Sequence, residues 1–286
     1  MRRWTALAVA VLITSASVAA GPAAVAQGGL PDPVDALKRQ FRKERGVRTS
    51  ETARVFFGVR SRSAFRISGT VQFGPSGAVA VDLTWRDVPE PGTGTGGKPS
   101  EKPPSYRVIR VGKDVYYDVA QYPGPVPGGK KWIRRNHAAG MTRYLAPAAS
   151  LQPVNVYDPS ILKAVLKRSR STPVSGGRLY QGTMSHKEMG RVTKGHYVDP
   201  FSGLSARKSK GKISWRLWTG HDGLVARLVT TDTLGAAKTS VFARTDTRYT
   251  GWGCRLVITA PPADEVIEQD DLAGYVPEPE PTLSPA

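Results

Sequence analysis

Two neighbouring runs of alternating apolar and polar residues stand out early in the chain. The apolar positions are Phe65, Ile67, Val71 and Phe73 in the first run and Val79, Val81, Leu83 and Trp85 in the second. A Gly-Pro-Ser-Gly turn at 74–77 separates the two runs. A period of two is typical of a strand with one buried and one solvated face, so the region predicts an antiparallel hairpin.

Similar patterns predict further strands along the rest of the chain. The expected ranges are 106–111 with 115–119, 130–135, 179–184, 213–217 with 224–228, 241–248 and 256–259. The strand at 130–135 is short and basic, and we expect it at an edge of the sheet, where charge discourages pairing with other molecules.

Two Asp-Pro pairs, at 32–33 and 158–159, predict the starts of helices, because aspartate caps a helix and proline fits its first turn. We expect these helices over 32–46 and 158–170. Leu37, Phe41 and Val47 form the apolar stripe of the first helix, and Ile161, Leu162, Val165 and Leu166 that of the second. Helices interspersed with adjacent hairpins favour an α+β fold, with a mainly antiparallel sheet and a few helices on one face.

The N-terminus has the layout of a secretory signal peptide. Arg2 and Arg3 precede an apolar run, and Ala24-Val25-Ala26 is a small-residue cleavage site. The alternative is a membrane anchor, although the run is short for a bilayer span. We expect a signal peptide at 1–26, a β-rich domain at 27–263 with a flexible loop at 88–105, and an acidic, proline-rich, disordered tail at 264–286. The mature chain would be monomeric, with no transmembrane span.

The formal net charge of +18 adds a class of partner. Acidic residues concentrate after Asp264, so the preceding domain is more basic than the whole chain. Such a surface attracts polyanions, and for an exported protein the nearest are anionic envelope polymers and lipids. The candidate contact residues are Lys130, Lys131, Trp132, Arg134 and Arg135. Nucleic acid is a less favoured partner.

Catalytic signals are few, and we predict no enzyme activity, cofactor or metal. Ser160-Ile161-Leu162-Lys163 fits the S-x-x-K pattern of penicillin-binding enzymes, yet Ser160 is more simply a helix-start residue. Cys254 lies among apolar residues, which favours a buried, inert thiol. The four histidines are far apart in the sequence and show no metal-binding spacing.

Several segments together resemble actinobacterial LolA-like envelope lipoproteins. They are Phe65 to Val71, Val115-Tyr116-Tyr117, Gly129 to Trp132, Asp158-Pro159-Ser160, Ile213-Ser214-Trp215, Asp222 to Leu228 and Ile258 to Pro262. The resemblance implies a strongly curved antiparallel sheet, or half-barrel, with helices closing its concave side. Some members carry acylated lipids or lipoproteins between sheet and helices. Here Pro22 stands where such lipoproteins have the acylated cysteine.

These observations lead to two functional hypotheses. The first is an exported, non-enzymatic carrier of an apolar or acylated ligand. Its cavity wall would come from Leu37, Phe41, Phe65, Ile67, Val71, Phe73, Val79, Val81, Leu83, Leu162, Val165, Leu166, Trp215 and Leu217. Direct packing of sheet on helices, without a cavity, is equally compatible with the pattern. The second hypothesis is a cationic cell-surface protein that binds anionic envelope polymers or lipids.

Overall fold

The computed structural model describes residues 30–57, 60–88, 105–122, 124–136, 150–194, 197, 209–234 and 241–272. Within these ranges twelve strands form one sheet. They are β1 (Arg45–Phe57), β2 (Arg60–Gly74), β3 (Gly77–Asp87), β4 (Ser105–Val111), β5 (Asp114–Asp118), β6 (Trp132–Asn136), β7 (Arg170–Val174), β8 (Gly177–Ser185), β9 (Lys212–Gly220), β10 (Val225–Leu234), β11 (Val241–Arg255) and β12 (Val266–Glu268).

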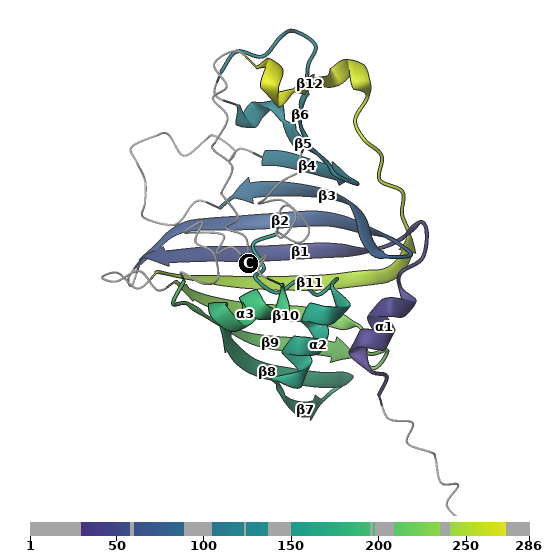
Figure 1. Ribbon diagram of the computed structural model, residues 1–286, viewed down its shortest axis with the longest axis vertical. Coiled ribbons are helices and arrows are strands. Elements are labelled where there is room, and N and C mark those ends of the chain that lie inside the picture. The colour runs from purple at the N-terminus through teal and green to yellow at the C-terminus, as the bar shows by residue number, and fades with distance from the viewer. Residues whose placement is uncertain are drawn as a thin grey trace, which may run out of the picture.

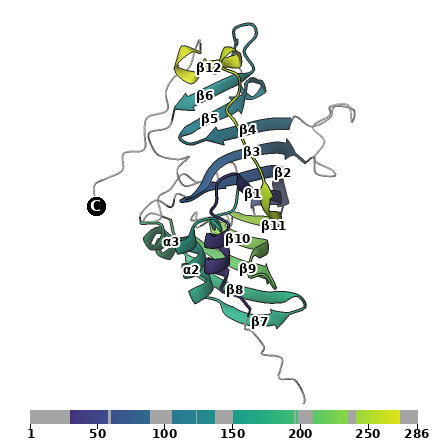
Figure 2. The same ribbon diagram turned by 90° about the vertical axis from the view of Figure 1, so that its right-hand side faces the viewer.

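The strands follow the order β12-β6-β5-β4-β3-β2-β1-β11-β10-β9-β8-β7. Every neighbouring pair is antiparallel except β12 and β6, which run parallel. The long strands β1, β2 and β11 lie at the centre, and the sheet curves strongly around its helices (Figures 1 and 2). The expected fold class, a curved antiparallel half-barrel with helices on the concave face, is confirmed.

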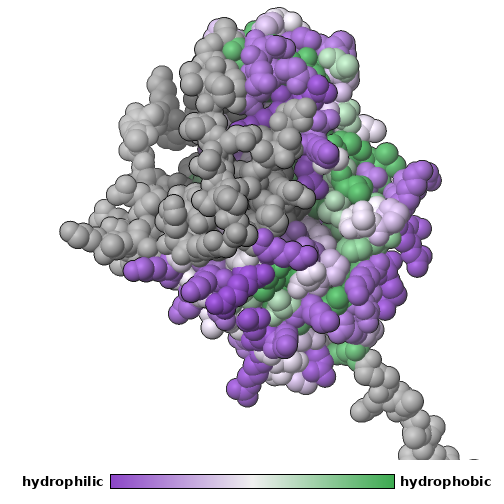
Figure 3. All heavy atoms as spheres, viewed as in Figure 1, coloured by the Kyte–Doolittle hydropathy of each residue, from purple (hydrophilic) through white to green (hydrophobic). Residues whose placement is uncertain are grey.

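Among the described residues, three α-helices accompany the sheet: α1 (Pro33–Arg39), α2 (Pro159–Lys167) and α3 (His186–Val192). Asp32 and Asp158 cap α1 and α2 as expected, each accepting two backbone amide hydrogen bonds. The third helix, α3, was not expected, and it begins at a capping box between Ser185 and Glu188. On the face that carries the helices, hydrophilic side chains gather over α2 and α3 (Figure 3).

The main hydrophobic core lies between the concave face of the sheet and the helices. Val71 on β2 pairs directly with Val81 on β3, and both are buried. From the helices, Leu37, Leu162 and Val165 complete the same cluster and are also buried. A separate, smaller cluster of Ile133, Ile267 and Leu272 lies where β6 meets β12.

Several boundaries differ from those expected at the ends of the elements. The first helix ends at Arg39 rather than at 46, and Val47 lies in β1, a strand that was not expected. The second helix ends at Lys167, because Arg170 begins the edge strand β7. The expected strand at 256–259 does not form, because the amides of Leu256 and Ile258 donate instead to the carbonyl of Glu44 and the side chain of Gln72.

The acidic segment after residue 263 also departs from expectation. Residues 264–272, expected in a disordered tail, contain β12 between two short 3-10 turns. β12 pairs with β6, so the basic strand is not at the edge of the sheet. The segment is ordered because Ile267 and Leu272 are buried, with exposed fractions of 9% and 4%.

Other expectations concern residues outside the described ranges. They include the signal peptide at 1–26, nearly all of the loop at 88–105 and residues 273–286 of the tail. Among the helices of the described residues, none has the length and apolar character needed to cross a membrane.

Candidate functional site

The central strand β1 places the carboxyl group of Glu51 on the otherwise mainly apolar concave face. Its side chain is buried, with 2% of its surface exposed. The Oε2 atom accepts hydrogen bonds from the hydroxyls of Ser150, at 2.6 Å, and Thr247, at 2.8 Å. The Oε1 atom accepts one from the backbone amide of Leu151, at 2.8 Å. Three donors therefore satisfy a group that would otherwise be costly to bury.

Two of these donors belong to a segment that crosses the concave face, residues 150–157, which we call the strap. Its Gln152 is buried and donates from Nε2 to the hydroxyl of Thr247, at 2.9 Å, and to the carbonyl of Leu228, at 3.1 Å. The Gln152 Oε1 atom accepts a hydrogen bond from the hydroxyl of Thr230, at 2.9 Å. Buried polar bonds to β10 and β11 thus hold the strap in place.

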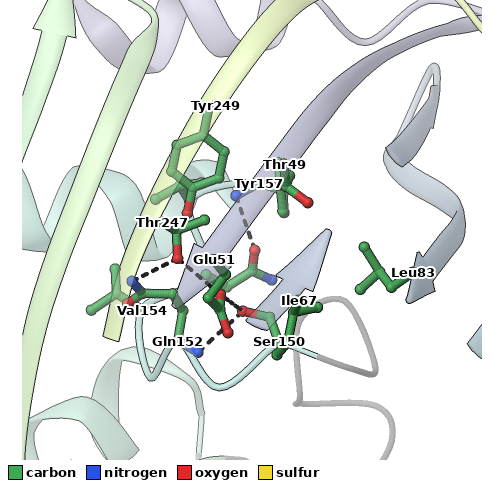
Figure 4. Close-up of a pocket in the computed structure, with 12 residues that line it drawn as sticks. Thr49, Glu51, Ile67, Leu83, Ser150, Gln152, Val154, Tyr157, Thr247 and Tyr249 are labelled. Atoms are coloured by element: carbon green, nitrogen blue, oxygen red, sulfur yellow. Dashed lines mark hydrogen bonds between the residues drawn. The ribbon is translucent and has the colours of Figure 1, made fainter. Parts of the chain in front are cut away.

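A hollow of about 20 Å³ lies between the strap and the sheet. Its apolar wall comes from Ile67 and Leu83, and its polar wall from Thr49, Glu51 and Thr247 (Figure 4). This volume accommodates about one water molecule. The hollow is therefore a small, closed groove in which the carboxyl group of Glu51 lies beside the apolar side chains of Ile67 and Leu83.

Two tyrosines also line the hollow, Tyr157 from the strap and Tyr249 from β11. Their ring centroids are 6.0 Å apart in an edge-to-face arrangement. Burial raises the pKa of both hydroxyl groups, so both stay protonated at neutral pH. Nearby, Phe73 and Trp252 stack in parallel with centroids 5.8 Å apart, which makes this end of the concave face rigid and aromatic.

The electrostatics of the hollow depend on Glu51. Burial raises the pKa of its carboxyl group, and the three hydrogen bonds that it accepts lower the pKa in part. A carboxyl group in such a place can hold a water molecule or a polar group of a ligand. A few placed polar groups in an apolar groove are typical of a binding site.

The structure gathers most of the predicted cavity residues into one core cluster. Its members from that set are Leu37, Phe41, Ile67, Val71, Phe73, Val81, Leu83, Leu162, Val165, Leu166, Trp215 and Leu217. Only Ile67 and Leu83 among them line the hollow. The others pack against one another, so their contact with a ligand stays a prediction.

Phe65 and Val79 lie outside this cluster and are only partly buried. The Phe65 ring contacts that of Trp85, with centroids 5.8 Å apart. At Val79 the pairing of β2 with β3 shifts, because a bulge follows Gln72. The simple alternation of the sequence is interrupted at this bulge.

The predicted basic contact surface on β6 is largely occupied by the chain itself. Lys131 and Arg134 form ion pairs with Glu265 and Glu268, at 2.5 and 2.6 Å. The ammonium group of Lys130 donates to a backbone carbonyl of the same acidic segment, at 2.9 Å. These three side chains are therefore engaged by residues that flank and form β12.

The two remaining residues of that surface are half buried. The guanidinium of Arg107 lies over the Trp132 ring, 5.7 Å from its centroid, on the face of the sheet opposite the helices. Arg135 has no ion pair with another described residue. Contact of the five residues with an anionic partner stays a prediction.

A second buried polar network was missed by the sequence analysis. His186 Nδ1 lies 2.5 Å from Ser209 Oγ, and His186 Nε2 lies 2.6 Å from Asp232 Oδ1. The hydroxyl of Tyr197 donates to Asp232 Oδ2, and the amide of Gly211 donates to Ser209 Oγ. The order resembles a Ser-His-Asp relay, but His186 has no exposed surface. The network instead ties α3 to β10, and an inward-facing aspartate on a strand was the one signal for it.

Other sequence candidates lie apart from the hollow. Ser160 and Lys163 are exposed on α2, and the amide of Ser160 donates to the capping Asp158, which fits a helix start. Cys254 is half buried in β11, rather than fully buried as expected. Among the described residues, no three His, Cys, Asp or Glu side chains gather closely enough to hold a metal ion.

Comparison with known proteins adds likenesses in structure only. No protein-family model matches the chain, and no curated protein matches its sequence. A LolA superfamily protein from Nitrosomonas europaea is 8% identical, with a TM-score of 0.27, over 79% of this chain and 93% of the other.

Two further solved structures are similarly distant. A DUF1329 family protein from Desulfovibrio piger is 12% identical, with a TM-score of 0.26, over 77% of this chain and 94% of the other. An S-type phycobiliprotein lyase from Guillardia theta is 4% identical, with a TM-score of 0.21, over 76% and 93%. Overlaps this low carry no statement about ligands, so the function is argued from the residues themselves.

Proposed function

We propose that the protein is a non-enzymatic binding protein for an acylated ligand with an anionic head group. The ligand would lie on the concave face, with its acyl chain against the apolar strands and its head group at Arg110. The protein would act outside the cytoplasm, after cleavage of the signal peptide behind Ala26. The observation that carries this proposal is the half-buried guanidinium of Arg110, whose Nε atom lacks a hydrogen-bond partner in the described structure.

Arg110 is a cation on an apolar surface. It pairs across the sheet with Val81 and Val115, which are both buried core residues. Its Nε atom is buried without a hydrogen-bond partner in the described structure, and one terminal nitrogen donates to the carbonyl of Ala78 over 3.4 Å. Burial lowers the pKa of the guanidinium. A carboxylate or phosphate would supply the missing acceptor, because guanidinium groups bind such anions in bidentate fashion.

The acyl chain has a suitable surface beside this cation. Leu83 faces Val108 across β3 and β4, and Arg110 is two residues further along β4. A second buried donor, Trp85 Nε1, also lacks a partner in the described structure and lies two residues from Leu83. Buried donors without partners are rare in proteins, which supports a surface that is completed by a ligand.

Uptake requires the strap to move. The hollow holds about one water molecule, whereas an acyl chain needs far more room. The side chains of Val154, Val156 and Tyr157 anchor the strap in the main core, and it is also held through polar bonds to Glu51 and by Gln152. The polar bonds contribute about 0.5–1.5 kcal/mol each, so ligand binding can displace them. The closed groove would then open over Ile67 and Leu83.

The test compares two fluorescent probes, a fatty acid and the matching uncharged fatty alcohol, on the mature protein. Arg110→Met should weaken fatty-acid binding by roughly tenfold or more and leave alcohol binding nearly unchanged. Its melting temperature should stay equal or rise, because an uncompensated buried charge is removed. Lys113→Met in the neighbouring exposed turn is the matched control. Failure of the unmutated protein to bind either probe would refute the proposal.

A further inference from the structure

The convex face of the sheet carries arginines on five consecutive strands. These residues alternate with inward-facing core residues, so their side chains point away from the helices. They are Arg227 on β10, Arg244 and Arg248 on β11, Arg54 on β1, Arg66 on β2 and Arg86 on β3. All are exposed except Arg227, which is half buried. We call these six residues the arginine band.

The register of the strands places these arginines directly opposite one another. Arg227 faces Arg248, Arg244 faces Arg54, and Arg66 faces Arg86. Like charges directly opposite each other on neighbouring strands destabilise a sheet. Three such pairs on one face therefore lower stability, and folding alone does not explain them.

Few acidic side chains compensate this charge. Arg227 forms a two-pronged ion pair with Asp246, with nitrogen to oxygen distances of 2.9 and 2.5 Å. Within the part of the chain that the structure describes, the other five members have no ion pair. Five of the six guanidinium groups of the band are therefore open to a ligand.

We propose that the arginine band binds a linear polymer that bears phosphate groups. Strands are about 4.8 Å apart, so the five strands span roughly 19 Å and could meet several successive charges of an extended polymer. Arginine forms bidentate bonds to phosphate, and exposed arginines in a row keep these bonds open to a passing chain. This surface is separate from the concave face and does not depend on the acyl-ligand proposal.

A polymer fits this face better than a membrane surface does. Proteins that lie on membranes insert exposed apolar side chains between the lipids. The exposed large apolar residues of the described structure are Leu30, Val174 and Val257, and none belongs to the strands of the band. A convex surface also touches a flat bilayer along only a narrow strip.

A single-stranded nucleic acid fits less well, because its recognition uses free aromatic faces for base stacking. The aromatic residues beside the band are Phe56 and Phe242, which stack on each other with ring centroids 4.5 Å apart, and Trp218. The Trp218 ring is covered by the guanidinium groups of Arg216 and Arg227, at 5.3 and 5.1 Å from the ring centroid. This face therefore offers charged contacts to phosphate groups rather than aromatic surfaces for base stacking.

The test measures binding of inorganic polyphosphate of defined length to the mature protein. The variant Arg54→Ser/Arg244→Ser removes one opposed pair, and Lys163→Ser/Lys167→Ser removes the same charge from the exposed side of α2. The first variant should lose roughly tenfold in affinity and the control less than about twofold, and binding should weaken steeply with salt. The first variant should also melt at an equal or higher temperature, because opposed charges are relieved.

Three outcomes would overturn the proposal. They are no polyphosphate binding by the unmutated protein, equal losses in both variants, and tighter binding to phosphatidylglycerol vesicles or a single-stranded oligonucleotide than to polyphosphate of matched charge. Equal losses would show that only net charge acts. Acyl-probe binding should be unchanged in the arginine variant, which separates this test from that of the concave face.

Discussion

At the scale of single residues, Glu51 joins the strap to the sheet through hydrogen bonds to Ser150, Leu151 and Thr247. Its pKa is raised in the folded protein by burial, above the ordinary value of 4.5. Between the ordinary and the raised value, the folded protein keeps a proton that the unfolded chain has lost. Stability from this group is therefore fully present below the ordinary pKa and is lost as pH rises through the folded pKa.

Replacing Glu51 by glutamine should remove this pH dependence. The amide keeps an oxygen for the Leu151 amide, and the hydroxyls of Ser150 and Thr247 can turn to accept instead of donate. Denaturant unfolding between about pH 4 and pH 8 should show wild-type stability falling relative to the variant with rising pH. Parallel stability curves for the two proteins would contradict a raised pKa at Glu51.

Substitutions of Leu83, which lines the hollow, distinguish a role in packing from a role in ligand binding. Leu83 is 2% exposed, so Leu83→Ala should cost about 2–5 kcal/mol of unfolding free energy. Leu83→Trp should overpack the closed groove, cost about 1–3 kcal/mol and block the acyl probe. Ile213→Ala is the control, a core residue that neither lines the hollow nor belongs to the predicted cavity wall; the folded variant should keep its probe affinity. Full probe binding by Leu83→Trp would place the ligand elsewhere.

At the scale of elements, the docking of β12 makes a clear prediction about truncation. A chain that stops after Leu272 should be as stable as the whole protein. One that stops after Pro262 loses two buried side chains, which contribute about 1.5–3 kcal/mol each before the cost of ordering the segment is subtracted. We expect a net loss of about 1–2 kcal/mol, or roughly 2–8 °C in melting temperature. Equal melting temperatures would show that β12 contributes nothing.

The sequence predicted those elements whose two faces differ in polarity. The hairpins β2–β3, β4–β5 and β9–β10 alternate over most of their length, and the two Asp-Pro helix starts are capped as expected. β1 escaped prediction because its inward positions include Thr49 and Glu51, which break the apolar period. β11 also turns Thr245 and Thr247 inward, although its part at 241–248 was predicted. Two of these inward polar residues, Glu51 and Thr247, bond to the strap.

Other parts of the candidate site could not be derived from local pattern. Ser150 is 99 residues from Glu51, and Asp232 is 46 residues from His186, so each network depends on strand order. The opposed arginines depend on register, which alternation alone leaves open. The acidic segment at 264–268 gave a compositional signal for disorder, and pairing with the basic β6 overrode it.

At the scale of the whole molecule, the two faces of the sheet carry different kinds of side chain. Its concave face is mainly apolar, with a half-buried cation at Arg110, and the strap and helices close part of it. Its convex face carries the arginine band. Under the two proposals, the concave face holds an acylated ligand and the convex face a phosphate polymer. The two functions should therefore be separable by mutation.

The most direct test of the central claim is the content of the concave face. Mature protein, exported and purified without detergent, would be extracted with organic solvent and the extract analysed by mass spectrometry. We predict a lipid with an acyl chain and an anionic head group from the unmutated protein, and much less of it from Arg110→Met. A lipid-free extract, or equal amounts of uncharged lipid from both proteins, would contradict the account.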